Sequence, residues 1–329
     1  MREFAYERAT DAAGAIAAGA VPGAKFICGG TNLLDLMKLE IEHPDRLVDI
    51  SRLPLREIEE TDDGGLRIGA HVDNASLAVD QRVRSRYPLV SQAVVSGASA
   101  QLRNKASTGG NLLQRTRCMY FYDPSSPCNK RTPGAGCSAM GGFNRFQAIL
   151  GASDACIATH PSDMAVAMVA LDAQVRLLGQ NGAEREIVLR DFYPPVNETP
   201  HIETVIQPGE LITHVRLPSP PPGRHHYRKV RDRASYEFAL VSVAAIVSLN
   251  GDTIASARIA FGGVAHRPWR STEAEEQLVG KPAMVQTFQT AADAALTSAK
   301  GRGYNDFKIP LLKRTLVTTL IGLTKGATQ

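Results

Sequence analysis

The hydrophobic positions of the first 217 residues predict short strands that alternate with short helices. Strict alternation of apolar and polar residues predicts strands, and apolar residues three or four apart predict helices. The predicted strands span residues 24–28, 46–50, 66–70, 175–178, 186–189 and 210–217. The predicted helices span residues 11–20, 33–38, 76–87 and 89–96. Residues 164–171 are apolar nearly all round, which predicts a buried helix.

The pattern changes after residues 218–223, a proline-rich segment typical of a semi-rigid linker. Two longer alternating stretches, 238–249 and 253–262, then flank Asn250-Gly251, which is a strong hairpin signal. Helical patterns follow at residues 271–279, 284–300 and 310–324. Strands followed by helices predict a separate α+β unit over residues 224–329.

Composition limits the classes of protein that fit this pattern. The chain has 329 residues, 43% of them hydrophobic, which is enough for two or three cored units. Its formal net charge of +4 is too mild to predict a nucleic-acid partner. No stretch approaches the roughly 20 apolar residues of a membrane helix, and the N-terminus lacks the pattern of a signal peptide. We therefore expect neither nucleic-acid binding nor membrane insertion.

Two glycine-rich turns are candidates for anion binding. Gly29-Gly30-Thr31-Asn32 lies between a predicted strand and a predicted helix, and Ser107-Thr108-Gly109-Gly110-Asn111 precedes a second pair of leucines. Glycines at such corners let backbone N–H groups approach a phosphate. One turn alone indicates only a tight corner, whereas two favour a diphosphate between them. No acidic residue follows at the ribose-binding offset, so a nicotinamide-type Rossmann site is excluded.

Four cysteines fall in a segment rich in glycine and proline. They are Cys118, Cys128, Cys137 and Cys156. No two of them are spaced as Cys-x-x-Cys, which argues against a zinc ribbon or a thioredoxin-like redox pair. A long irregular loop inside a compact domain needs something to order it. Four thiolates suit either an iron–sulfur cluster or structural zinc. Unrelated thiols or two disulfides are the remaining alternatives.

A polar group also begins the buried helix. Ser162 and Asp163 stand at its predicted N-terminus, where a capping role is the ordinary reading. The alternative is that the Asp163 carboxylate accepts hydroxyl or ring N–H groups of a bound ligand.

Several motifs, taken in order along the chain, resemble the FAD-binding medium subunits of the xanthine dehydrogenase/molybdenum hydroxylase family. They are residues 26–33, 108–112 and 160–164, followed by 227–231 and 261–265. The cysteine insertion is similar to that of the FAD subunit of bacterial periplasmic aldehyde oxidoreductase, which carries a 4Fe–4S cluster. The resemblance covers essentially the whole chain.

The resemblance implies an α+β fold with a two-part, PCMH-like FAD-binding domain over residues 1–217. Its subdomains would span about 1–57 and 58–217, with an iron–sulfur insertion at 115–158, the linker at 218–223 and a C-terminal domain at 224–329. The FAD-binding residues implied are Phe26, Ile27, Cys28, Gly29, Gly30, Thr31, Asn32, Leu33, Leu34, Ala106, Ser107, Thr108, Gly110, Asn111, Asp163, Ile212 and Lys229. The implied cluster ligands are Cys118, Cys128, Cys137 and Cys156.

The resemblance gives three of these residues particular roles. Asp163 would contact the ribityl or adenosine part of FAD, and Ile212 would pack near the isoalloxazine. Lys229 would stabilise negative charge on reduced flavin; the alternative is a surface lysine, because basic runs such as residues 228–233 are usually solvated.

The implied function is that of an electron-transfer subunit of a molybdenum-containing aldehyde oxidoreductase, inactive toward substrate alone and without catalytic residues. Its partners would be a large subunit with the molybdenum cofactor and a small subunit with 2Fe–2S clusters. FAD would pass electrons to an external acceptor other than NAD, such as a ferredoxin-like protein. The complex would be periplasmic, exported with a signal-bearing partner, or alternatively cytoplasmic.

Two rival functions use the same residues differently. A free-standing flavoprotein oxidase would need its own substrate chemistry, but the sequence offers no Ser/His/Asp or paired-carboxylate constellation. A structural subunit stabilised by zinc would hold the metal on the four cysteines.

Overall fold

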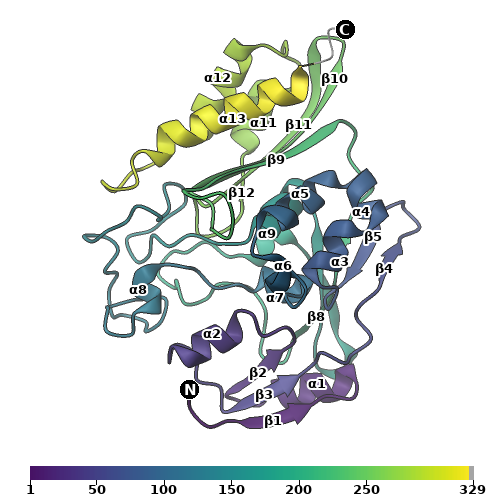
Figure 1. Ribbon diagram of the computed structural model, residues 1–329, viewed down its shortest axis with the longest axis vertical. Helices are drawn as coiled ribbons and strands as arrows, with labels where there is room; N and C mark the ends of the chain where they lie inside the picture. Colours follow the sequence, from purple (N-terminus) through teal and green to yellow (C-terminus); the bar gives the residue numbers. More distant parts are fainter. Residues whose placement is uncertain (326–329) are drawn as a thin grey trace.

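The computed structural model describes residues 1–325, in which three sheets follow one another along the long axis (Figure 1). The first is a parallel sheet in the order β1-β3-β2, made of β1 (Ala5–Arg8), β2 (Ala24–Ile27) and β3 (Arg46–Asp49). The helices α1 (Ala12–Gly19) and α2 (Leu33–Lys38) belong to this part. Asp11 begins α1 because its side chain accepts the N–H of Gly14 at 2.7 Å.

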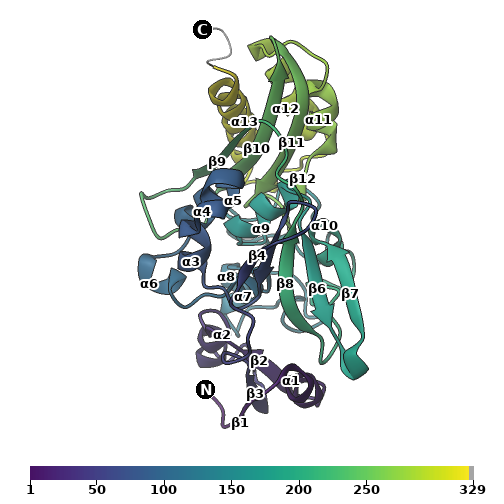
Figure 2. The same ribbon diagram turned by 90° about the vertical axis from the view of Figure 1, so that its right-hand side faces the viewer.

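The second sheet is antiparallel, with the order β4-β5-β8-β6-β7. Its strands are β4 (Ile58–Glu60), β5 (Leu66–Gly69), β6 (Gln174–Leu178), β7 (Glu184–Val188) and β8 (Leu211–Leu217). The helices of this region are α3 (Asn74–Val79), α4 (Gln81–Arg86), α5 (Pro88–Ser96), α6 (Ala100–Arg103), α7 (Thr108–Leu112), α8 (Met119–Tyr122), α9 (Asp163–Ala170) and α10 (Leu189–Phe192). Figure 2 shows α3, α4 and α5 on one side of this sheet.

The third sheet is also antiparallel, in the order β12-β11-β10-β9, and lies at the opposite end from β1. It contains β9 (Arg224–Val230), β10 (Val241–Asn250), β11 (Thr253–Gly262) and β12 (Trp269–Arg270). The helices α11 (Thr272–Leu278), α12 (Val285–Ala295) and α13 (Lys308–Thr324) follow it, and α13 packs on β10. This α+β arrangement, with the hairpin at Asn250-Gly251, confirms the predicted architecture of the C-terminal part.

Helix α9 is central to the molecule. All eight of its residues are buried, as the apolar run predicted, and the helix contacts α5, α7 and both strands of the C-terminal hairpin. It therefore joins the core of the middle sheet to the C-terminal sheet, and whatever stands at its first turn lies at that junction (Figure 1).

Lys308 makes a second connection, between the C-terminal domain and the end of the cysteine segment. Its side chain is fully buried, and its Nζ donates to the carbonyl oxygens of Gln147, Phe146 and Gly263. These three acceptors compensate for the burial of the ammonium group. Residues 146–147 are thereby fixed against the start of α13.

Two of the sequence predictions were wrong in detail. The single helix predicted over 76–87 is two helices, because the Asp80 carboxylate accepts the N–H groups of Arg82 and Val83 and starts α4. The second glycine turn, which the similarity of the two motifs predicts to follow a strand as the first one does, has no strand before it. It follows helix α6 instead, and Gly109 and Gly110 lie inside α7.

The structure contradicts the alternative reading of Lys229 as a surface lysine of the basic run. Tyr227 and Lys229 lie on β9 with buried side chains, although such runs are usually solvated. Among residues 1–325, none of the helices has both the length and the apolar character needed to cross a membrane.

Candidate cofactor site

The first glycine corner connects β2 to α2. Gly30 has a φ of +71°, a region that favours glycine. A Cβ at Gly29 would overlap the carbonyl oxygen of Lys105, which directly precedes the second corner. Within residues 1–325, the backbone N–H groups of Gly30, Thr31 and Asn32 donate no hydrogen bond. The corner therefore presents a row of free donors, as an anion requires.

The second glycine corner is a capped helical turn that lies against the first. Ser107 caps α7 by accepting the Gly110 N–H at 3.2 Å, while Gly109 N donates to the carbonyl of Ala70 at 2.8 Å. Burial raises the pKa of the Cys28 thiol, and a hydrogen bond with Ser107 acts in the opposite direction. The two corners lie against each other, because Gly29 closely approaches the backbone of Lys105.

Asp163 stands next to the second corner. Ser162 donates from Oγ to Asn111 Oδ1 at 2.5 Å and accepts the Ala165 N–H at 2.9 Å, so it caps α9 and ties it to α7. This confirms the capping prediction for Ser162. Asp163 is the first residue of the helix, and its carboxylate is buried.

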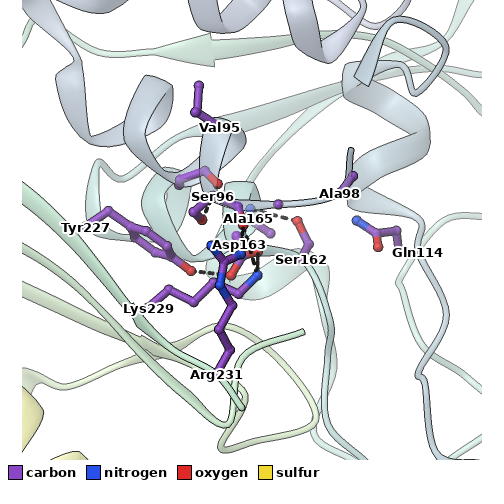
Figure 3. Close-up of polar contacts among 12 residues, drawn as sticks. Val95, Ser96, Ala98, Gln114, Ser162, Asp163, Ala165, Tyr227, Lys229 and Arg231 are labelled. Atoms are coloured by element: carbon purple, nitrogen blue, oxygen red, sulfur yellow. Dashed lines mark hydrogen bonds and ion pairs between the residues drawn. The ribbon is translucent and has the colours of Figure 1, made fainter. Parts of the chain in front are cut away.

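Two side chains of β9 converge on that carboxylate (Figure 3). Lys229 Nζ lies 2.7 Å from Asp163 Oδ2, and the Tyr227 hydroxyl donates to Oδ1 at 2.5 Å. The Lys229 and Asp163 side chains are only 4% and 9% exposed, so this is a buried ion pair. Burial, and then the Asp163 charge, raise the pKa of Tyr227 well above its usual value. The structure thus brings Asp163 and Lys229 together, although they are 66 residues apart.

Among the other predicted flavin residues, Phe26 and Ile27 lie on β2, Leu33 and Leu34 on α2, Ala106 just before the second corner, Thr108 on α7, and Ile212 on β8. Ile212 is a buried residue of β8, paired with Leu177 in the core of the middle sheet. Helix α7 packs against this strand, so the core of the middle sheet supports the second corner.

We expect Asp163→Asn to destabilise the folded protein by about 3 kcal/mol, because it leaves the Lys229 ammonium buried without a charged partner. The urea midpoint measures this loss. The control is Asp63→Asn, which removes a carboxylate from a half-exposed pair with Arg216 and should leave the urea midpoint nearly unchanged. Equal shifts in the two variants would contradict a buried pair at Asp163.

The four predicted ligand cysteines gather in one part of the molecule. Cys118, Cys128 and Cys156 are buried in one hydrophobic cluster, and Cys137 packs against it. Cys128 and Cys137 also face each other across an isolated backbone bridge. All five cysteines are free, so the structure does not support the disulfide alternative.

The surroundings of these thiols suit a multi-iron cluster. Gln147 Nε2 donates to Cys118 Sγ at 3.3 Å, and the Ala158 N–H donates to Cys156 Sγ at 3.4 Å. Hydrogen bonds to sulfur of this kind tune iron–sulfur clusters. Burial is the main cause that raises the pKa of Cys156 to about 12, so the free thiol is protonated and only a bound metal would hold it as thiolate.

Within the described residues, no three His, Cys, Asp or Glu side chains are placed to hold one metal ion. A mononuclear zinc site needs every sulfur about 2.3 Å from the same ion. A cluster of several irons instead contacts each thiolate at a different iron, so its ligands stand farther apart. The set of four cysteine ligands, whether for a cluster or for zinc, stays a prediction.

Some residues of this region were missed at the sequence level. Tyr227 was not identified as a partner of Asp163, although Tyr227, Lys229 and Arg231 alternate as residues on one face of a strand do. Arg115 and Lys130 were also missed; both are tied to Glu203, and no local pattern marks such a contact.

Two protein families match this chain, and the boundary between the two matches falls at the proline-rich linker. Residues 2–220 match the FAD binding domain in molybdopterin dehydrogenase, and residues 225–320 match the CO dehydrogenase flavoprotein C-terminal domain. The chain therefore belongs to the FAD-binding subunits of the molybdenum hydroxylase family, a family of oxidoreductases, as the resemblance predicted.

Individual relatives show which members of this family the chain is similar to. The aldehyde oxidoreductase FAD-binding subunit PaoB of Escherichia coli K12 is 58% identical over 97% of this chain and 98% of its own length. The carbon monoxide dehydrogenase medium chain of Afipia carboxidovorans is 26% identical over 93% of this chain and 91% of its own. A chain in the structure of quinoline 2-oxidoreductase from Pseudomonas putida 86 has a TM-score of 0.77 at 24% identity, covering 100% of this chain and 99% of that one, and shares the fold.

Proposed function

We propose that this chain is the electron-transfer subunit of a molybdenum-containing aldehyde oxidoreductase, holding FAD and a 4Fe–4S cluster. The observation that carries the proposal is the pairing of two touching glycine corners with four grouped free thiols in one FAD-subunit fold. The 58% identity to PaoB, an aldehyde oxidoreductase FAD-binding subunit, supports the aldehyde as substrate class.

The chain's own residues would hold FAD in three places. The free N–H groups at Gly30, Thr31 and Asn32 would bind the diphosphate, and the second corner would support it from the other side. Asp163, held by Tyr227 and Lys229, would face the polar part of the cofactor. When bound, a flavin supplies the conversion between one-electron and two-electron chemistry.

The partners follow from the proposed role. Aldehyde oxidation would take place on a large subunit with the molybdenum cofactor, and a small subunit with 2Fe–2S clusters would connect it to this chain. The acceptor would be a protein or small molecule other than NAD, such as a ferredoxin-like protein. We also propose that the complex is periplasmic and that a partner subunit carries the export signal.

Absorption spectroscopy and metal analysis of the complex, purified anaerobically with its natural partners, test this function. We expect one FAD per chain with its yellow absorption, together with iron and acid-labile sulfide in this subunit. Zinc at one per chain, with no iron beyond that of the partner's 2Fe–2S clusters, would favour the structural-subunit alternative. An active isolated monomer that oxidises its own substrate would favour the free-standing oxidase.

A further inference from the structure

Arg115 lies between the two proposed cofactor sites. It is the first residue of the cysteine segment and follows the second glycine corner by four residues. Its backbone N–H donates to Asn32 Oδ1 at 3.0 Å, and Asn32 is the last residue of the first corner. A position in the cysteine segment is therefore tied directly to a residue of the proposed diphosphate loop.

The Arg115 side chain joins three further segments. Nη1 donates to Glu42 Oε1 at 2.6 Å, in the loop after α2, and Nε donates to Glu203. Nη2 donates to the carbonyl oxygen of Lys130 at 3.3 Å. Every nitrogen of the guanidinium thus has a partner, and the two carboxylates belong to segments on either side of the cysteines in sequence.

The hydrogen bonds and ion pairs around Arg115 and Glu203 also include Lys130, which is close to a cysteine in sequence. Its side chain is 6% exposed, and its Nζ donates to Glu203 Oε1 at 3.0 Å and to the carbonyl oxygen of Pro200 at 2.8 Å. Lys130 is two residues from Cys128, so the charged network holds the backbone on which this thiol stands.

Apolar packing links the same elements. The Arg115 guanidinium lies over the Phe121 ring, 4.6 Å from its centroid. Phe121 is fully buried in the cluster that contains Cys118, Cys128 and Cys156. Leu36 and Ile41 belong to that cluster too, and Leu36 is part of α2. One end of α2 therefore faces the first glycine corner while its buried side packs on the cysteines.

Only arginine can make this set of contacts. A planar guanidinium carries five N–H donors in a fixed fork, whereas a lysine ammonium is a point charge that cannot reach two carboxylates and a carbonyl in different directions. Losing the fork would leave the partly buried Glu203 with Lys130 alone and the partly buried Glu42 with only the longer contact to Lys25.

From this geometry we infer that Arg115 is a positioning residue that couples the two sites, so that a filled cysteine site raises the affinity of the glycine corners for FAD. This rests on the proposed function, since it takes both cofactors as bound. Coupling free energies are reciprocal, so bound FAD would equally slow the loss of iron.

The test measures FAD dissociation constants for the complex with its partners, once with iron loaded and once after chelation. Their ratio is the coupling factor. For the unaltered chain we expect about tenfold tighter binding in the iron-loaded form. In Arg115→Gln, and also in Arg115→Lys, the ratio should fall to nearly one. The control is Arg67→Gln, which removes an exposed pair with Glu59 and should keep the original ratio.

The outcomes separate this inference from the proposed function. The coupling is contradicted if the ratio of FAD dissociation constants is unchanged in Arg115→Gln, or if it is one in the unaltered chain. Either result leaves the proposed binding of FAD and of the cluster unaffected. An unaltered complex that contains FAD but no iron beyond that of the partner's 2Fe–2S clusters overturns the cluster, and the coupling with it. If Arg115→Gln does not fold, Glu42→Gln removes the ion pair between the Arg115 side chain and the first subdomain while Arg115 itself stays in place, and a lowered ratio there supports the inference while an unchanged one refutes it.

Discussion

Gly29→Ala is expected to remove most of the bound FAD from the purified protein. A Cβ at this position would overlap the carbonyl oxygen of Lys105, which is backbone and cannot rotate away. The two glycine corners would have to separate, at a cost of about 3 kcal/mol. If that displacement disrupts the diphosphate contacts, FAD binds roughly 100-fold more weakly. Flavin absorption per chain after gel filtration, and a titration of FAD into the stripped protein, measure the loss.

Gly141→Ala is the matched control for this variant. Gly141 has an ordinary φ and nothing within 4 Å of the added Cβ, so the same change there should leave flavin content unaltered. Circular dichroism of both variants checks that the fold persists. Full flavin occupancy in a folded Gly29→Ala protein would show that the corners do not hold the diphosphate.

The elements that could be predicted from sequence are those whose signals are local. Helix 33–38 and the hairpin at Asn250-Gly251 depend on residues a few positions apart, and both are found as predicted. The cap at Ser162 is equally local, because a side chain and an N–H three residues later suffice to form it.

Local signals failed where a short side chain competed with the periodic pattern. The apolar spacing over 76–87 favours one helix, but Asp80 caps a new helix in the middle of it. In the second glycine turn, two leucines follow the glycines, as two leucines follow those of the first corner. Ser107 nevertheless caps a helical turn there, with no strand before it.

The polar network of the candidate site could not be derived from sequence, because its members are distant along the chain. Arg115 and Glu203 are 88 residues apart, and Asp163 and Tyr227 are 64 apart. Each charged side chain alone is indistinguishable from a solvated one. Only the packing of α9 on the C-terminal sheet places the Asp163 carboxylate against β9.

Cys128→Ser is expected to abolish the iron–sulfur cluster. A serine hydroxyl is a poor replacement for thiolate, which is the ligand that these clusters use. The iron held by this subunit should fall from about four atoms to nearly none, and the visible absorption that this cluster adds to that of the partner's clusters should disappear. Cys128 lies outside both glycine corners, so the protein should still bind FAD when FAD is supplied in excess.

Cys28→Ser is the control, because Cys28 directly precedes the first corner and lies outside the hydrophobic cluster that the other four cysteines form or pack against. It should retain the iron and the acid-labile sulfide. Unchanged cluster absorption in Cys128→Ser would remove Cys128 from the ligand set. Loss of iron in Cys28→Ser but not in Cys128→Ser would mean that the cluster lies at the glycine corner, beside the flavin phosphates, and not in the segment 115–158.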